Sequence, residues 1–252
     1  MTDRTAPQNP TTTRRSRRAL LAGVTVAAVA GAALAGPVGA ASAENLVGTF
    51  KAQKGTYKKS GKKVTATGSY FRMIYPNGSK AKGPWFNNTD SKAKDNTYTL
   101  FKPGIDGGLR TGQYQEHPTP AFDTRGFALA NRIVQPLPFA GINFSLGTAA
   151  KDYQSGGAAS VPKLTRGKKI KGTTYRLTGD LRAFNVGWNS IYFNQGTPKA
   201  NGTLPGKTSK LTGTYDTKTH KYEINWQSQI VGGPFNDFTG DWYFAGKFVP
   251  AK

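Results

Sequence analysis

The chain has 252 residues, and its 35 lysine and arginine side chains outnumber its 13 aspartate and glutamate side chains, which gives a formal net charge of +22. It contains no cysteine, which excludes disulfide bonds, thiolate catalysis and cysteine-ligated metal sites. Aromatic residues make up 12% of the chain, and together with 31 glycines and 15 prolines they favour a loop-rich β protein over a helical one.

Residues 1–43 differ in composition from the rest of the chain. Arg17 and Arg18 precede two leucines, a weakly hydrophobic run rich in alanine and glycine, and the sequence Ala41-Ser42-Ala43. This arrangement resembles a twin-arginine (Tat) secretory signal with a small-residue cleavage site. The resemblance implies that the Tat machinery exports residues 44–252 already folded, to the cell exterior or the periplasm, with no transmembrane anchor after cleavage. The alternative is an uncleaved anchor, because the apolar run is about long enough to span a bilayer.

Residues 44–252 keep 30 of the basic and 12 of the acidic side chains, a net charge of +18. A surplus of this size attracts polyanions over long distances, but it does not determine a fold. Alternating residues predict a strand between residues 64 and 75, ended by a turn at Pro76-Asn77-Gly78. We expect the lysines before this strand to form a hairpin or arm at a sheet edge. These lysines are Lys51, Lys54, Lys58, Lys59, Lys62 and Lys63.

The middle of the chain is less regular. Short alternating runs predict strands at residues 98–101 and 142–146. A helix of one or two turns is compatible with residues 127–132. Residues 152–172 are rich in glycine, serine and lysine, which predicts a loop.

Metal ligands are scarce in this sequence. The only histidines, His117 and His220, are predicted to lie on the surface, away from any carboxylate cluster with metal-ligand spacing. An Asp-Gly-Gly turn at Asp106 is a weak hint of calcium, because Lys102 and Arg110 stand beside its single carboxylate. We therefore predict no metal site and no organic cofactor.

The clearest strand pattern lies between residues 222 and 230. Tyr222, Ile224, Trp226 and Ile230 alternate with polar residues, which is typical of a half-buried antiparallel strand. Flanking runs at residues 211–215 and 238–248 predict a three-stranded meander with it, and residues 173–193 predict a second group of strands.

A Thr-Gly-x-aromatic or Thr-Gly-x-Leu motif occurs four times, beginning at Thr67, Thr178, Thr212 and Thr239. Glycine within a strand marks a bulge or a bend, which barrels and strongly coiled sandwiches need. Residues 211–215 together with 224–226 resemble the hairpins of avidin-type β-barrels. We predict that residues 44–252 form one all-β domain, a single antiparallel β-sandwich or β-barrel with long loops, and that it is a monomer.

Recognisable catalytic motifs are absent from the sequence: there is no nucleophile elbow, no phosphate-binding loop and no metalloprotease motif. Asp237 and Asp241 share one face of a predicted strand, but at roughly 13 Å apart they are too distant for a glycosidase pair. The sequence therefore favours a non-catalytic protein, with a carbohydrate-active enzyme as an alternative.

The first binding hypothesis is an anionic polymer of the cell envelope. Residues 44–252 contain 23 lysines against 7 arginines, and lysine gives a salt-sensitive point-charge attraction. The alternative is a solvated surface without a partner. Nucleic acid is disfavoured because no nucleic-acid-binding module is recognisable. The predicted contacts are the six lysines named above together with Lys168, Lys169 and Lys171.

The second hypothesis is a glycan or a small ligand in a β-barrel. Glu223, Asn225, Gln227 and Gln229 form a polar row, beside which Trp188 or Trp242 would be a stacking plane. The alternative is that this row faces water on the outside of a sheet. The sequence thus predicts an exported binding or surface-associated protein, whose partner is an anionic or glycan polymer.

Overall fold

The computed structural model describes residues 43–252, which belong to one compact unit. Arg17, Arg18 and Ala41 of the predicted signal lie outside the described residues, and Ala43 is the first residue inside them. No helix in the described part of the chain is long and apolar enough to cross a membrane.

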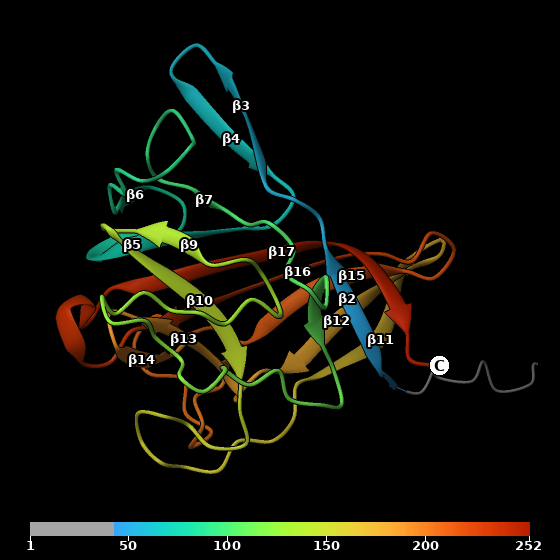
Figure 1. The fold of residues 1–252 in the computed structure, drawn as a ribbon. Coiled ribbons are helices and arrows are strands. Elements are labelled where there is room, and N and C mark those ends of the chain that lie inside the picture. Colours follow the sequence, from blue (N-terminus) through green and yellow to red (C-terminus); the bar gives the residue numbers. More distant parts are fainter. Residues whose placement is uncertain (1–42) are drawn as a thin grey trace, which may run out of the picture. The chain divides into compact units, whose positions relative to one another are not determined.

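The described domain is all-β, as the sequence predicts. Eleven strands form one large sheet that curls into half a barrel, in which neighbouring strands are antiparallel (Figure 1). Its main path runs β1-β11-β12-β15-β16-β17-β2-β8, and β5 pairs with β17, β6 and β7. The strands are β1 (Glu44–Leu46), β2 (Gly48–Ala52), β5 (Tyr70–Ser79), β6 (Gly83–Trp85), β7 (Thr99–Leu100), β8 (Gly108–Arg110), β11 (Lys163–Lys171), β12 (Thr174–Asp180), β15 (Leu211–Asp216), β16 (Lys221–Gln229) and β17 (Thr239–Pro250).

Two smaller sheets complete the domain. A four-stranded sheet has the order β14-β13-β10-β9, with β9 (Leu137–Phe139), β10 (Ile142–Thr148), β13 (Phe184–Trp188) and β14 (Ile191–Asn194). It packs against the large sheet, because Phe184 contacts the aromatic rings of β16 and β17. The strands β3 (Thr56–Ser60) and β4 (Lys63–Thr67) form a separate hairpin, which extends away from the other strands at the top of Figure 1.

The predicted meander is β15-β16-β17, and its inner face supplies the centre of the core. Trp226 is fully buried and stacks on Trp242 and Phe244, with ring centroids 5.9 Å apart in both pairs. Phe184 approaches Trp226 edge-on at 5.2 Å. Aromatic rings bury large apolar areas and gain further stability in such geometries, so these four rings anchor the two sheets to each other.

Strand β17 pairs with two different strands along one edge. Thr239 to Tyr243 pair with β5, and Gly246 to Pro250 pair with β2. At the junction, the Ser69 hydroxyl donates to the carbonyl oxygen of Ala245 and accepts from its amide, both at 3.1 Å. Ser69 is fully buried, so its hydroxyl satisfies backbone groups at the junction that water does not reach.

The Thr-Gly motifs have two structural roles. Gly68 lies between β4 and β5 with φ of +73°, and a Cβ there would lie 2.2 Å from the carbonyl oxygen of Lys54, so this glycine permits a sharp bend. Gly240 instead lies within β17, where a Cβ would lie 2.4 Å from Gln195 Oε1. The bend predicted at each motif is thus present at Gly68, whereas Gly240 allows close packing.

Three local predictions were wrong. Residues 127–132 form no helix, because the amides of Phe127, Ala128 and Leu129 bond to Asp123 Oδ1, the Asn143 carbonyl and the Ala121 carbonyl. The second half of the predicted 152–172 loop is β11, which pairs with β1 and β12. The turn at residues 76–78 does not end its strand, since β5 continues to Ser79 with an irregular register.

Candidate functional site

The predicted polar row lies on the outer face of β16, away from the aromatic core. Glu223, Asn225, Gln227 and Gln229 stand opposite Ala245, Tyr243, Asp241 and Thr239 of β17. Glu223 is exposed and the other three are half-buried. The structure therefore brings the four residues together on one face, as period-two alternation predicts.

Neither predicted stacking plane is available beside this row. Trp242 is 1% exposed and stacks on Trp226 inside the core. Trp188 is 8% exposed, and its indole donates to the carbonyl oxygen of Phe139 at 2.8 Å. The assignment of these two tryptophans to a ligand site was wrong, because both belong to the core-facing sets of their strands.

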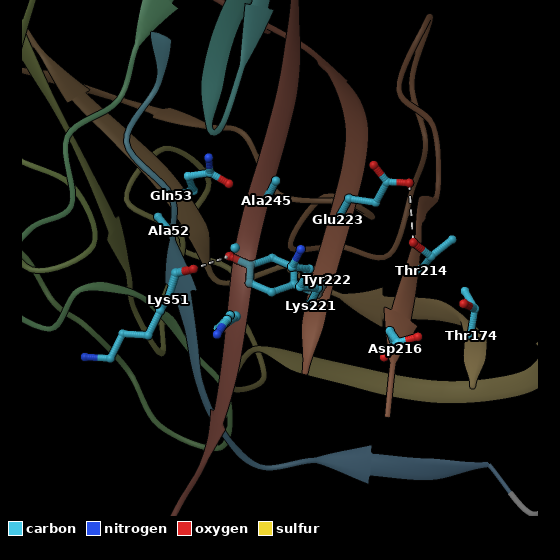
Figure 2. Close-up of a pocket in the computed structure, with 12 residues that line it drawn as sticks. Lys51, Ala52, Gln53, Thr174, Thr214, Asp216, Lys221, Tyr222, Glu223 and Ala245 are labelled. Atoms are coloured by element: carbon cyan, nitrogen blue, oxygen red, sulfur yellow. Dashed lines mark hydrogen bonds between the residues drawn. The ribbon is translucent and has the colours of Figure 1, made fainter. Parts of the chain in front are cut away.

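An open groove of about 580 Å³ crosses the outer face of β12, β15, β16, β17 and β2. Its floor is a row of Thr214, Glu223 and Ala245 on β15, β16 and β17, continued by Gln53 just beyond the end of β2, and Figure 2 labels these four residues. The methyl group of Ala245 is the smallest side chain of this row. It leaves a gap between the longer side chains of Glu223 and Gln53, and this gap forms the centre of the groove.

Glu223 is held in position by two hydroxyl groups. Thr214 Oγ1 donates to Glu223 Oε1 at 3.3 Å, and the Tyr243 hydroxyl donates to Glu223 Oε2 at 2.6 Å. Burial and the bond to Glu223 raise the pKa of Tyr243, so this phenol stays protonated at neutral pH. A carboxylate offers about four lone-pair positions, so Glu223 retains acceptor capacity for hydroxyl groups of a ligand.

Two tyrosines lie on the outer face next to Glu223, beside the groove rather than among its lining residues. Tyr243 and Tyr70 stand opposite each other on β17 and β5, and their rings stack with centroids 5.0 Å apart. Burial raises the pKa of Tyr70 to about 12. Both rings are half-buried on the outer face, where the sequence interpretation had expected Trp188 or Trp242.

Three lysines stand in the next cross-strand row, on the other side of the floor. Lys221 is opposite Lys247, and Lys247 is opposite Lys51. Like charges directly opposite each other are destabilising in a sheet, so an anion bound beside them would relieve their repulsion. Lys51 Nζ donates to the carbonyl oxygen of Asp106 at 3.1 Å, and Figure 2 shows its side chain extending away from Glu223.

The remaining acidic residue of the groove is Asp216, whose oxygens bond to its own turn and to Thr173 in the turn between β11 and β12. Thr173 Oγ1 donates to Asp216 Oδ2 at 2.6 Å, and the Thr219 amide and hydroxyl donate to Oδ1. The bond from Thr173, followed by those from Thr219, lowers the pKa of Asp216 to about 2. Asp216 is thus ionised but already hydrogen-bonded, and it forms no ion pair with Lys221 within 4 Å in the described residues.

Arginines and lysines are used differently across the described domain. Of the six ion pairs among residues 43–252, five use an arginine, and the sixth joins Lys80 to Asp241 at 2.8 Å. Arginine matches carboxylate geometry in two-point contacts, which suits internal pairs. Apart from the buried Lys199 and the half-buried Lys207, the lysines of residues 43–252 are exposed.

The outer face continues beyond Tyr243 into a charged cluster that the sequence interpretation missed. The Arg72 guanidinium lies 3.3 Å from the ring centroid of Trp85 and 4.2 Å from that of Tyr98. Asp241 is 3% exposed, and its burial raises its pKa, while Lys80 opposes the shift. Arg72 already occupies a face of Trp85, so this cluster stabilises the covering strand β6.

The two aspartates considered as a catalytic pair have separate partners. Asp241 pairs with Lys80, whereas Asp237 Oδ1 accepts from Gln229 Nε2 at 3.0 Å. Asp237 lies before β17 with φ of +66°, outside the regular strand that placed it on the face of Asp241.

The predicted lysine clusters lie on two different sheets. Lys58, Lys59, Lys62 and Lys63 are exposed on the β3-β4 hairpin, which confirms the expected arm. Lys54 precedes the hairpin, and Lys51 belongs to the groove of the large sheet. Lys168, Lys169 and Lys171 are exposed at the end of β11, which belongs to the large sheet. The nine lysines predicted to contact a polyanion therefore do not all lie on one sheet.

His117 is buried, which corrects the prediction of a surface histidine. It is 8% exposed, its Nε2 lies 2.5 Å from Asn185 Oδ1, and its ring packs edge-on against Tyr192. Burial lowers the pKa of His117, so the ring is neutral at neutral pH. His220 is exposed, as predicted, and bonds to the Tyr215 hydroxyl at 2.8 Å.

The Asp106 turn does not present a free carboxylate to a cation. Arg132 Nε, Gln115 Nε2 and Arg110 Nη2 contact the Asp106 oxygens at 2.8, 2.9 and 3.3 Å. Hydrogen bonds from Arg132 and Gln115 lower the pKa of Asp106 against the effect of burial. Within residues 43–252, no three histidine or carboxylate side chains are grouped in a way that could hold a metal ion.

A second cavity, of about 450 Å³, contains the buried Lys199. This lysine is 7% exposed, and its Nζ donates to Asn194 O, Ser228 Oγ and Gln229 O at 2.7, 2.7 and 2.6 Å. Burial lowers the pKa of Lys199 to about 7, whereas Asp152 opposes the shift. Three acceptors match the three N–H groups of an ammonium ion, so Lys199 connects β14 and β16 rather than offering a free amine.

Comparisons with known protein families, with curated proteins and with solved structures found no match to this chain. The outer-face groove is therefore interpreted from its own geometry.

Proposed function

We propose that residues 44–252 form an exported binding domain of the cell envelope, and that its outer-face groove holds an acidic glycan polymer. The observation that supports this most is the adjacency of two cross-strand rows. The row of Glu223, Ala245 and Gln53 offers hydrogen bonds to hydroxyl groups, and the row of Lys221 and Lys247 offers charge to carboxylate or phosphate groups.

The shape of the groove favours a polymer over an enclosed small molecule. The groove is open at the surface and crosses five strands, so a chain of sugar rings could extend along it. Tyr243, which bonds to Glu223 beside the groove, has a half-buried ring, and this ring is the aromatic surface that a pyranose ring would contact. The hydroxyl groups and the anionic groups of one polymer would thus be bound at neighbouring positions of the groove.

The main test is binding of the 44–252 domain to cell-wall fractions at about 50 mM and about 500 mM salt. Ala245→Trp should fill the groove and weaken binding by at least about tenfold, or about 1.4 kcal/mol. Val249→Trp is the matched control, because Val249 is exposed on the same strand and does not line the groove. Equal binding by both variants, with unchanged thermal unfolding, would contradict the groove as the site.

The charge component has its own test. Replacing Lys221 and Lys247 with glutamine should reduce the salt dependence of binding, while Glu223→Ala should weaken binding at both salt concentrations. Binding that is fully released by salt in the unaltered domain would show that charge alone is responsible and would remove the glycan component.

We further propose that residues 1–43 direct export through the Tat machinery, on the basis of Arg17, Arg18 and the Ala41-Ser42-Ala43 sequence. Replacing both arginines and the neighbouring pair Arg14-Arg15 with lysine in the full chain should leave an unprocessed precursor inside the cell. Continued export of this variant would exclude the route. A mature N-terminus upstream of Glu44 would exclude the proposed cleavage position.

A further inference from the structure

The β3-β4 hairpin is attached to the domain only at its base. The Gly55 amide donates to the Phe101 carbonyl at 2.8 Å, and the Ser69 amide donates to the Gln53 carbonyl at 3.0 Å. Between these anchors, residues 56–67 make hydrogen bonds only within the hairpin among the described residues. Figure 1 shows the hairpin extending away from the other sheets, and each residue of its two strands is exposed or half-buried.

The two faces of the hairpin differ in chemistry. In the strand register, Tyr57 is opposite Ala66 and Lys59 is opposite Val64, which places these four residues on one face. Tyr57, Val64 and Ala66 are half-buried and are the apolar side chains of the hairpin, whereas Lys59 is exposed. The opposite face contains Lys58 and Lys63 together with threonine and serine. The hairpin is therefore amphipathic, with Lys59 at the end of its apolar face nearest the turn.

The charge of the hairpin is not neutralised within the domain. Lys58, Lys59, Lys62 and Lys63 are exposed, and no aspartate or glutamate occurs between residues 45 and 89. None of these four lysines belongs to the six ion pairs in residues 43–252. A concentration of unpaired charge on a small projecting element is complementary to a densely anionic surface.

We propose that the β3-β4 hairpin docks the domain on an anionic lipid bilayer. Tyrosine favours the headgroup level of a membrane, where its ring is apolar and its hydroxyl is solvated, and lysine stems extend along apolar surface toward phosphate groups. A soluble polyanion without sugar rings, such as polyphosphate, would use the lysines but would gain nothing from Tyr57 and Val64. The apolar face beside the lysines thus favours the bilayer as the partner.

The test uses the 44–252 domain, which has its own core, and sedimentation with vesicles of phosphatidylglycerol and phosphatidylcholine or of phosphatidylcholine alone. The domain should bind only the anionic vesicles. Replacing Lys58, Lys59, Lys62 and Lys63 with glutamine should weaken that binding by at least about a hundredfold, since each lysine near an anionic surface contributes roughly a factor of five. All four are exposed, so the core is unaffected.

The matched control replaces four exposed lysines of β11, namely Lys163, Lys168, Lys169 and Lys171, which gives the same net charge. It should retain most of the binding, and an equal loss in both variants would show that net charge alone is responsible and overturn the proposal. Ala245→Trp, which blocks the groove, should bind vesicles normally, so failure of the docking proposal is distinguishable from failure of the glycan proposal.

A second variant tests the apolar face. Tyr57→Ser should weaken vesicle binding by about tenfold, while Tyr57→Trp should preserve it, because the aromatic ring at the interface is retained. Soluble polyphosphate is the competing probe. If the hairpin lysines are needed for polyphosphate binding while anionic vesicles bind the unaltered domain no better than neutral ones, the hairpin is a polymer-binding arm and the bilayer proposal is wrong.

Discussion

The β16-β17 pair and the β3-β4 hairpin are both antiparallel pairs of strands with alternating side chains, but only the first has a face that is buried in the core. In β16-β17, the inner residues Trp226 and Trp242 are almost fully buried. In β3-β4, every residue is exposed or half-buried, and the equivalent positions hold Tyr57 and Val64. Alternation thus specifies which side chains share a face, but a second layer of protein decides whether that face stabilises the fold or stays available to a partner.

Truncating the centre of the core should have the largest effect on this comparison. Trp226→Ala removes a fully buried ring that contacts Trp242, Phe244 and Phe184, and it should lower the free energy of unfolding by about 3–5 kcal/mol in urea titrations. Asn225→Ala, one residue away on the outer face, should change it by less than about 0.5 kcal/mol. A similar loss of unfolding free energy in both variants would mean that the outer face of β16 contributes as much to stability as its inner face.

The junction of β17 should show the next largest effect. Ser69→Ala leaves the amide and carbonyl of Ala245 without their buried hydroxyl partner, which should lower the free energy of unfolding by about 1–3 kcal/mol. Ser60→Ala, on the exposed hairpin, is the control and should have no measurable effect. A neutral result for Ser69→Ala would indicate that water replaces the hydroxyl at this position.

Lys199 sharpens the comparison, because it is a lysine in the interior whereas the hairpin lysines are exposed. Its pKa of about 7 in the folded state lies below the ordinary value of 10.5, so between these two values the unfolded chain binds more protons. The free energy of unfolding should therefore rise as pH increases from about 7 to about 10. Lys199→Met should remove this rise, and a rise that persists in the variant would assign it to other groups.

Stability changes should be smallest in the hairpin. Lys63→Gln alters an exposed side chain that has no carboxylate partner within 4 Å in residues 43–252. The free energy of unfolding, measured by thermal unfolding, should therefore change by less than about 0.5 kcal/mol. A destabilisation comparable to that of Ser69→Ala would mean that the hairpin packs on the domain in solution.

Local alternation was sufficient to predict β16 and the shared face of its polar row, because the period-two pattern from Tyr222 to Ile230 is broken only by Ser228 on its apolar face. The same reasoning missed β11, since its lysine-rich composition obscures a strand whose pairing is supplied by β12 and β1. Composition indicates how strongly the side chains prefer water, whereas strand pairing satisfies the hydrogen-bonding groups of the backbone. At the edge of a sheet, a strand can therefore be rich in lysine and still pair.

The groove itself required long-range pairing. Glu223 was identified from the sequence, but Gln53 reaches the same floor only because β2 pairs with the second half of β17. Tyr243 was overlooked because its neighbours Trp242 and Phe244 dominate the pattern of that strand. The burial of His117 likewise depends on Asn185 and Tyr192, which belong to strands far along the chain.

Strand β17 also constrains the order of events during folding. It holds β2, β5 and β16 at once, and its contact between Ser69 and Ala245 joins residues 176 positions apart. Closing a loop of this length has a large entropic cost, which slows assembly. β2 can pair with β8, and β5 with β6 and β7, but the edges of β2 and β5 that face β17 stay unpaired until the ribosome has completed the segment through Pro250. The nascent chain consequently exposes bare strand edges until synthesis has passed this point, which makes chaperone protection during translation an expected requirement of this fold.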